Sequence, residues 1–188
     1  MSQVVGIVAD SPNKIRGYRT DMLIFEEAGS WPNLKKAFIQ GQALIGILGN
    51  QFGFSIAGGT GGDSGPALEG LRDIYYNPTA YNVLPLRHKF TSTGEVALTG
   101  YFLPAYSMVL APGYIDNRGW TDPDKARKFH EAERAKKAND PKGLLIYQAE
   151  FCFNAEEAFA LEGDNKFNKI ILSSQLANIR IHKLGPKI

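Results

Sequence analysis

Two neighbouring carboxylates, Glu26 and Glu27, directly follow the apolar run MLIF at residues 22–25. Such a run predicts a strand that is buried on both faces, and in an open α/β sheet ligands collect at the carboxyl ends of the strands. Two acids at that point can hold a magnesium ion and orient a water molecule for attack on a γ-phosphate. The alternative is a buried strand that ends in a solvated acidic turn, because short patterns of this kind also occur by chance.

A glycine-rich bend, GGTGGDSG at residues 58–65, follows another predicted strand, FGFSIA. In many nucleotide hydrolases the strand beside the acidic one ends in a polar residue that senses the γ-phosphate, and Thr60 occupies that place. Gly59 and Gly61 on either side of it let the backbone approach a ligand closely. We therefore expect the acidic pair and Thr60 to face one nucleotide pocket. The alternative is a flexible turn between a strand and a helix.

Alternating strands and helices must position these residues. The predicted strands cover residues 4–9, 22–25, 52–57, 81–86 and 95–109, and the predicted helices cover residues 31–48, 64–77 and 122–138, a segment from Pro141, a short segment capped by Asn154 and Glu157, and residues 169–181. This order favours an α/β protein with a mostly parallel sheet flanked by helices, followed by a helical C-terminal segment. A change in composition divides the chain into residues 1–110 and 111–188.

The composition is that of an ordinary soluble domain. The chain has 188 residues, of which 44% are hydrophobic and 21% charged, and its net charge of +2 is too small to indicate nucleic-acid binding by itself. A single cysteine, Cys152, excludes an internal disulfide and a cysteine-rich zinc site, and we expect it to be a packing residue. No apolar stretch is long enough to suggest a membrane span.

Two further expectations concern residues away from the acidic pair. His130 lies on the strongly charged segment 122–138 and is expected to be solvated, and the three histidines stand too far apart for a metal site. The aromatic residues Tyr101, Phe102, Tyr106 and Trp120 are not interleaved with basic residues. Core packing therefore explains these aromatic residues better than base stacking does.

Three segments of the chain resemble tailed-phage large terminases, the ATPase motors that package viral DNA. IRGYRTDMLIFEEAG at residues 15–29 resembles the arginine-containing segment and acidic strand of that family. SIAGGTGGDSG at residues 55–65 resembles its coupling motif, and EFCFNAEEAFALEGDNKFN at residues 150–168 resembles the segment that leads from the ATPase toward the nuclease. The three matches occur in the family's order and span most of the chain, and the first and last are together more specific than the middle one.

The resemblance implies a role for each matching residue near the predicted nucleotide. Glu27 would be the general base or water-orienting carboxylate of ATP hydrolysis. Glu26 would support the magnesium ion through water, at a position where the family usually has Asp. Thr60, with Gly59 and Gly61 beside it in the nucleotide-binding bend, would couple hydrolysis to movement.

Two arginines precede the acidic strand in the same match. Arg16 would serve a neighbouring subunit as an arginine finger, and Arg19 is the second candidate for nucleotide contact. Such a finger stabilises the charge on the phosphoryl group during transfer. The alternative for both arginines is a loop residue paired with Asp21 or with solvent.

The fold implied by the resemblance is an incomplete P-loop NTPase-like sheet of the ASCE type. Residues 1–110 would be the Walker B and coupling-motif half of the ATPase, and residues 111–188 a mainly helical linker or lid toward a nuclease. No Gly-Lys dipeptide occurs in the chain, so the Gly-x-x-x-x-Gly-Lys-Ser/Thr loop that cradles phosphates is missing. ATP and Mg²⁺ would need residues of a missing segment or a partner chain. A split gene, a cut fragment and a degenerate relative all fit, and the start at Met1 ahead of a predicted strand favours the split gene.

The implied function is part of a motor that hydrolyses ATP to move double-stranded DNA into a procapsid in the host cytoplasm. The implied partners are double-stranded DNA, a portal protein, a small terminase subunit, and either further copies in a ring or a complementing terminase chain, with no membrane. Two other functions stay open. One is a non-catalytic assembly module derived from a terminase ATPase, and the other is an unrelated α/β nucleotide-binding protein.

Overall fold

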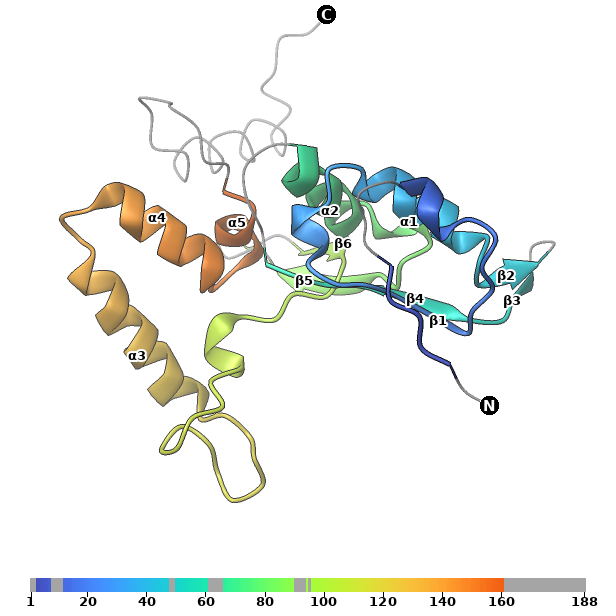
Figure 1. Ribbon diagram of the computed structural model, residues 1–188. Coiled ribbons are helices and arrows are strands. Elements are labelled where there is room, and N and C mark those ends of the chain that lie inside the picture. The colour runs from blue at the N-terminus through green and yellow to red at the C-terminus, as the bar shows by residue number, and fades with distance from the viewer. Residues whose placement is uncertain are drawn as a thin grey trace, which may run out of the picture. The chain divides into compact units, whose positions relative to one another are not determined.

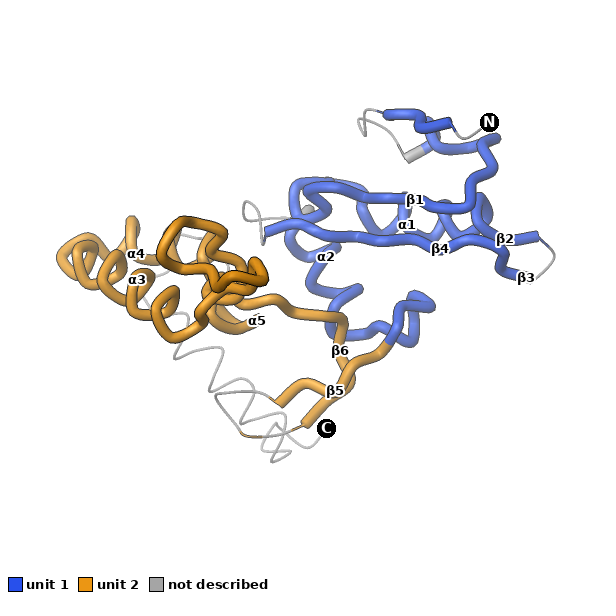
Figure 2. The backbone as a smooth tube through the Cα atoms, turned by 90° about the horizontal axis from the view of Figure 1, so that it is seen from below, with its two compact units in different colours: residues 1–84 blue, residues 85–188 orange. Residues whose placement is uncertain are grey.

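The computed structural model describes residues 3–7, 12–47, 50–60, 66–89, 94 and 96–160, and the chain divides into two compact units, Met1–Leu84 and Pro85–Ile188 (Figures 1 and 2). The described strands form three two-stranded sheets, of which one is parallel and two are antiparallel. The protein is thus mixed α/β, as expected, but the described strands do not join into one mostly parallel sheet. The predicted boundary near residue 110 lies later than the division between the units and stays a prediction.

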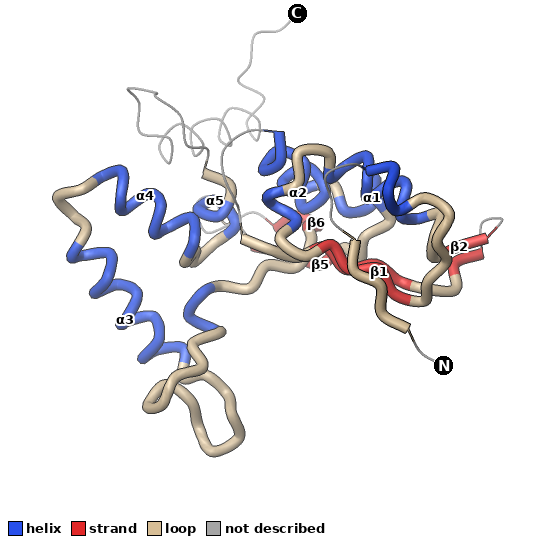
Figure 3. The backbone as a smooth tube through the Cα atoms, viewed as in Figure 1, coloured by secondary structure: helices blue, strands red, loops and turns tan. Residues whose placement is uncertain are grey.

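The first unit is built around a parallel strand pair, β1 (Met22–Phe25) and β4 (Phe54–Ala57). Its other elements, in chain order, are η1 (Pro12–Ile15), η2 (Ala28–Ser30), α1 (Leu34–Gln42), the hairpin strands β2 (Gly46–Ile47) and β3 (Asn50–Gln51), α2 (Pro66–Tyr76) and η3 (Pro78–Tyr81). Parallel strands need a crossover connection, and α1 lies within that connection here (Figure 3).

Helices α1 and α2 pack on one face of the β1–β4 pair and form the core with it. The buried core side chains are Phe25, Ala28, Leu34, Ala37, Phe38 and Ile74. Gly41 allows α1 to lie close to β1, because a Cβ at this position would be 2.6 Å from Cδ2 of Leu23. The same face of β1 thus presents Leu23 and Phe25 to the helices.

The opposite face of the strand pair is apolar and exposed. Met22 and Phe54 are register partners, as are Ile24 and Ile56. These four side chains are between 46% and 59% exposed. Parallel sheets are almost always covered on both faces, and among the described residues β1 and β4 pair only with each other. Among the described residues, no layer covers this face and no third strand pairs with either edge of the pair.

Two predicted elements at the beginning of the chain differ from the structure. Residues 3–7 form no strand and Val4 is 99% exposed, while the rest of the predicted strand at 4–9 lies outside the described residues. An apolar run becomes a strand only beside a partner strand, and this one has none among the described strands. The helix predicted over residues 31–48 is wrong beyond Gln42, where the chain turns into the β2–β3 hairpin. Leu44 and Ile45 are nevertheless buried. Their apolar side chains therefore indicated burial correctly, although the backbone there is not helical.

Two later strands were also predicted with the wrong extent. Residues 81–86 were expected to be a strand, but η3 ends at Tyr81 and β5 begins only at Leu86. Of the strand predicted over residues 95–109, only β6 (Val96–Thr99) forms, and it pairs antiparallel with β5 (Leu86–Lys89). This pairing is a hairpin between segments close in sequence, so it does not extend the parallel pair.

The helices of the second unit begin where the sequence predicted. After η4 (Ala105–Ser107) come α3 (Pro123–Lys136), α4 (Pro141–Glu150) and α5 (Ala155–Ala158). Each α-helix has a side-chain cap: Asp122 accepts from the Lys125 amide at 3.1 Å, Asp140 from Gly143 at 3.0 Å, and Asn154 from Glu157 at 2.8 Å. No helix among the described residues combines the length and apolar character that a membrane span requires. The predicted helix at residues 169–181 lies outside the described residues.

The expectation for His130 is wrong, because this side chain is only 3% exposed. Its Nδ1 lies 2.9 Å from the Tyr147 hydroxyl, and its ring contacts Phe129, Phe151 and Phe153. Burial, together with the positive charge of Arg134, lowers the pKa of His130 below its ordinary value. His130 is therefore a neutral core residue of the second unit at pH 7.

Cys152 and the aromatic residues of the second unit have different outcomes. Burial raises the pKa of the Cys152 thiol to about 11, so it stays protonated at neutral pH. The side chain is half-buried, and its packing role stays a prediction. Tyr106 packs edge-on against Phe153, with ring centroids 5.2 Å apart. Trp120 and Tyr101 are each 73% exposed, so the expectation of core packing is wrong for these two.

Candidate functional site

The carboxyl ends of β1 and β4 lie side by side, which brings the acidic pair next to the glycine-rich bend. The strands run parallel with Phe25 opposite Ala57, so both chains leave the sheet at the same edge (Figure 2). Glu26 and Glu27 follow β1 there, and Gly58 begins the bend that follows β4. The spatial relation between the two motifs that the sequence predicted is therefore present.

Backbone hydrogen bonds join the bend to the acidic turn. The Gly58 amide donates to the Phe25 carbonyl at 3.1 Å, and the Ala28 amide donates to the Gly58 carbonyl at 3.0 Å. Gly58 thus forms hydrogen bonds to the residue before and to the residue after the two acids Glu26 and Glu27. The arrangement fixes the acidic turn relative to the bend through main-chain atoms and does not depend on any side-chain contact.

Gly59 is the point where the two segments come closest. A Cβ at this position would be 2.9 Å from the Ala28 nitrogen and 3.0 Å from the Glu27 Cα, and the Gly59 φ is +156°. Both contacts are with backbone, which cannot move aside as a flexible side chain could. The sequence prediction that a glycine permits a close approach holds here, although the approach is to the acidic turn of the same chain.

Glu27 has a left-handed backbone, with φ 49° and ψ 42°. A non-glycine residue pays a conformational penalty in this region, and such residues concentrate at functional sites. The Glu27 carbonyl accepts from the Ser30 amide at 2.9 Å, which begins the short helix η2. Its side chain is exposed at the strand edge, so the strained backbone presents a carboxylate to solvent and not to the core.

Replacing Glu27 with Gly is expected to stabilise the protein by about 0.5–1 kcal/mol. Relief of the left-handed conformation, worth ~1–2 kcal/mol, exceeds the ~0.5–1 kcal/mol of extra chain entropy that glycine loses on folding. Glu27→Ala keeps the left-handed strain and is expected to give no such gain. Urea unfolding of the three proteins measures the difference, and a Gly variant no more stable than the Ala variant would contradict a strained Glu27.

Asn82 provides a matched comparison because it is the other described non-glycine residue with positive φ, at 54°. Asparagine tolerates this conformation better than glutamate does. The Asn82 side-chain amide also donates to Gln51 at 3.0 Å. We therefore expect Asn82→Gly to be neutral or destabilising, which would set the gain at Glu27 apart from a general effect of glycine.

Glu26 is held by its main chain while its carboxylate stays exposed. The Trp31 indole donates to the Glu26 carbonyl at 3.0 Å, and the Trp31 ring packs edge-on against Phe25 with centroids 5.4 Å apart. Trp31 therefore anchors the acidic turn to the core. This role was not predictable, since an indole five residues after a glutamate forms no recognisable motif.

Thr60 is described and exposed, whereas Gly61 lies outside the described residues. Thr60 follows Gly59 directly, so its backbone leaves the sheet at the edge that also carries Glu27. The role of Thr60 as a γ-phosphate sensor and that of Gly61 in nucleotide binding both stay predictions.

Glu26 and Glu27 belong to no metal-binding cluster among the described residues. Across the described part of the chain, no three His, Cys, Asp or Glu side chains gather closely enough to hold a metal ion. Magnesium is usually bound through one or two carboxylates, with waters and substrate phosphates supplying its other ligands. A magnesium ion supported by Glu26 therefore stays a prediction.

Arg16 and Arg19 lie at the amino end of β1, before Met22, while the acidic turn follows its carboxyl end. The Arg19 guanidinium donates to the Gly46 carbonyl at 3.2 Å, at the start of β2. The structure therefore does not bring the two arginines to the edge that carries Glu27 and Thr60. An arginine-finger role toward another subunit stays a prediction.

Comparison of the chain with protein-family models, curated proteins and solved structures finds no match. The candidate site is defined by its own geometry: a strained acidic turn and a glycine bend, joined through backbone hydrogen bonds at one edge of a parallel strand pair.

Proposed function

We propose that this chain is the catalytic-glutamate part of a DNA-packaging ATPase of the large-terminase type, completed by polypeptide that carries the phosphate loop. The observation that carries the proposal is the shared edge, where the Glu26–Glu27 turn and the Gly58–Thr60 bend are joined by two backbone hydrogen bonds. Open α/β sheets bind ligands at the carboxyl ends of their strands. We assign the β1–β4 pair to an ASCE-type P-loop-like sheet on this basis.

The proposed chemistry is phosphoryl transfer from ATP to water. Catalysis of this reaction is mostly positioning and electrostatic stabilisation. The Glu27 carboxylate would accept a hydrogen bond from the attacking water and orient it, and Glu26 would help to hold a magnesium ion through water. The Thr60 hydroxyl contacts the γ-phosphate from the neighbouring strand end, so that departure of this phosphate after hydrolysis is transmitted to β4 and α2.

The completing polypeptide follows from two features of the chain. The sequence contains no Gly-Lys dipeptide, so the lysine and backbone amides that cradle the β- and γ-phosphates must come from elsewhere. The β1–β4 pair also has an exposed apolar face and no further strand among the described residues. A complementing terminase chain that adds strands to this pair would supply the phosphate loop and also cover the exposed strands. Double-stranded DNA, the portal protein and the small terminase subunit are the partners of such a motor in the host cytoplasm.

The proposal is tested by ATP hydrolysis with and without a complementing chain. Purified alone, the chain is expected to hydrolyse no ATP above a protein-free background, because most of the triphosphate binding is missing. Mixed with the product of a neighbouring gene that contains Gly-x-x-x-x-Gly-Lys-Ser/Thr, it is expected to show turnover. Robust turnover by the chain alone would overturn the incomplete site, and a stable complex without turnover would overturn the ATPase.

The exposed apolar face also favours a second candidate, the non-catalytic assembly module. In that function Met22, Ile24, Phe54 and Ile56 bind the partner, and the acidic turn has no chemical role. Both candidates predict the same complex. Removal of the Glu27 carboxylate should lower ATP turnover if the chain is part of an ATPase, and should have no effect if it is an assembly module.

A further inference from the structure

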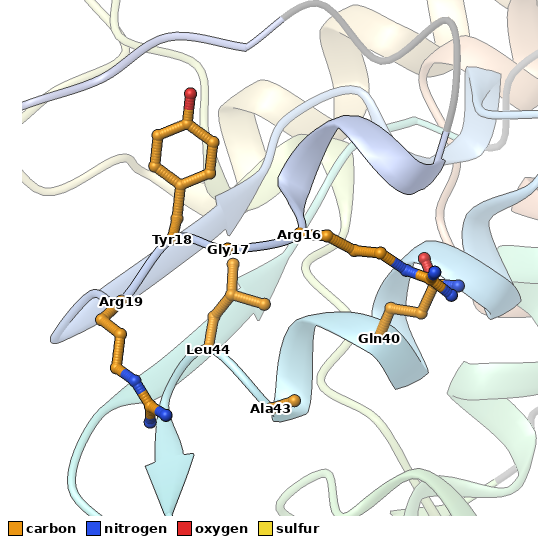
Figure 4. A pocket seen from close by; sticks show the side chains of 7 residues that line it. All are labelled: Arg16, Gly17, Tyr18, Arg19, Gln40, Ala43 and Leu44. Atoms are coloured by element: carbon orange, nitrogen blue, oxygen red, sulfur yellow. The ribbon is translucent and has the colours of Figure 1, made fainter.

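A depression with a volume of about 400 Å³ lies at the amino end of β1, away from the acidic turn (Figure 4). Arg16, Tyr18 and Arg19 line it from the segment between η1 and β1, and Gln40 and Leu44 line it from the end of α1. In Figure 4 the Arg16 side chain extends toward Gln40, whereas the Arg19 side chain points the other way, past Leu44. The two guanidinium groups therefore lie on opposite sides of the depression.

The surroundings of the depression are basic. None of the described residues that line it carries a carboxylate. The sequence of residues 12–20, PNKIRGYRT, has three basic residues and no acidic one. Lys35 of α1 does not line the depression and is paired with Asp73 at 3.1 Å, so it does not add to this charge. The first acidic residue after this segment is Asp21. Such a concentration of one sign attracts anions even though the net charge of the whole chain is small.

The lining segment is fixed to the core on both sides. Ile15 is buried beside Arg16, and the Arg16 amide donates to the Asn13 carbonyl at 3.1 Å. The Thr20 amide donates to the Leu44 carbonyl at 3.2 Å, which ties the end of the segment to the turn after α1. Because the backbone of the segment is already fixed, binding has to order only the arginine side chains and not the segment itself.

We propose that this depression binds phosphate groups of a nucleic-acid backbone, at a site separate from the Glu27–Thr60 edge. Arginine guanidinium matches phosphate oxygens through paired hydrogen bonds. Arg16, Tyr18 and Arg19 are all exposed, and an open depression of this kind suits a polymer that passes over it, whereas small molecules are mostly enclosed. Tyr18 adds a hydroxyl that can donate to phosphate. The site stands whether or not the chain takes part in ATP hydrolysis.

The test is a titration of a fluorescently labelled 20-base-pair DNA duplex with the full chain at several salt concentrations. Changing both Arg16 and Arg19 to Gln is expected to weaken binding by about tenfold or more and to lower the slope of log K against log salt by about two, one for each phosphate that is no longer neutralised. Changing both to Lys keeps the charge but removes the paired geometry, and is expected to weaken binding less.

A charge-matched control separates this site from general attraction. Arg118 and Lys128 are exposed cations in the second unit, and changing both to Gln removes the same charge elsewhere. Far-ultraviolet circular dichroism and the unfolding midpoint confirm that each variant is folded. Equal weakening by the two double variants, or no weakening by Arg16→Gln with Arg19→Gln, would overturn the proposal. Displacement of the duplex by millimolar inorganic phosphate or ATP, as effectively as by unlabelled duplex, would identify a free phosphate compound as the ligand and also overturn the nucleic-acid assignment.

Discussion

Replacing Glu27 with Gln is expected to lower the kcat of ATP hydrolysis by the completed motor by about 10²–10⁴-fold, the range typical for loss of a positioned acid–base group. Glutamine has nearly the same shape and keeps the left-handed backbone of this position, which has φ 49°. It lacks the negative oxygen that orients the attacking water. Assembly with the complementing chain should therefore be unchanged, because the β1–β4 pair and its apolar face remain as they are.

Two matched variants distinguish a specific effect of Glu27 from a general effect of removing a carboxylate. Glu26→Gln should reduce turnover less and raise the Mg²⁺ concentration required, since in the proposed site this carboxylate would support the ion only through water. Glu150→Gln changes an exposed glutamate of the second unit, at the end of α4, and should leave turnover unchanged. Gel filtration of each mixture measures assembly separately from chemistry. Unchanged turnover with Glu27→Gln would refute the catalytic role and favour the assembly module.

The shared edge was predictable because each part of it has a local signal. MLIF and FSIA are short apolar runs, and each is followed at once by residues that end a strand: two charged acids in one case and glycines in the other. Apolar positions between them predicted a helix, and a helical crossover between strands favours parallel pairing. Parallel pairing then places both strand ends at the same edge, which is what β1 and β4 show.

The elements that were mispredicted depend on partners far away in the sequence. Whether the run at residues 4–9 becomes a strand depends on a neighbouring strand, and the run itself carries no information about that neighbour. His130 shows the same limit, because the charged residues around it on α3 predict solvent, whereas Tyr147 on α4 and Phe153 after it bury the ring. Local patterning thus located the strand ends but could not assign the surfaces that cover them.

The exposed apolar face of the strand pair could not be read from the sequence for a related reason. Met22 and Ile24 alternate with Leu23 and Phe25, and all four are apolar. A strand with this pattern is expected to be buried on both faces. Only one face meets the helices in the described structure. The uniform apolar pattern therefore indicates that a second layer is needed, without saying which polypeptide supplies it.

Gly59→Ala is expected to destabilise the first unit by about 2–5 kcal/mol, whereas Gly58→Ala, one residue earlier, should change its stability by less than about 0.5 kcal/mol. A Cβ at Gly59 would lie 2.9 Å from the Ala28 nitrogen and 3.0 Å from the Glu27 Cα, whereas a Cβ at Gly58 would meet nothing within 4 Å. The large cost combines ~1–3 kcal/mol for the forced backbone contact with ~1–2 kcal/mol for the unfavourable φ.

The difference between these two glycines tests the contact on which the site depends. Trp31 and Trp120 are the two tryptophans of the chain, so in a Trp120→Phe background the fluorescence of Trp31 reports on the acidic turn alone, through its hydrogen bond to the Glu26 carbonyl. Urea unfolding followed by this signal should shift to lower urea for Gly59→Ala and stay in place for Gly58→Ala. Equal midpoints for the two variants would mean that the bend does not press against the Glu27–Ala28 backbone. In that case the edge of the proposed nucleotide site would be fixed only by the pairing of β1 with β4 and by the two backbone hydrogen bonds of Gly58.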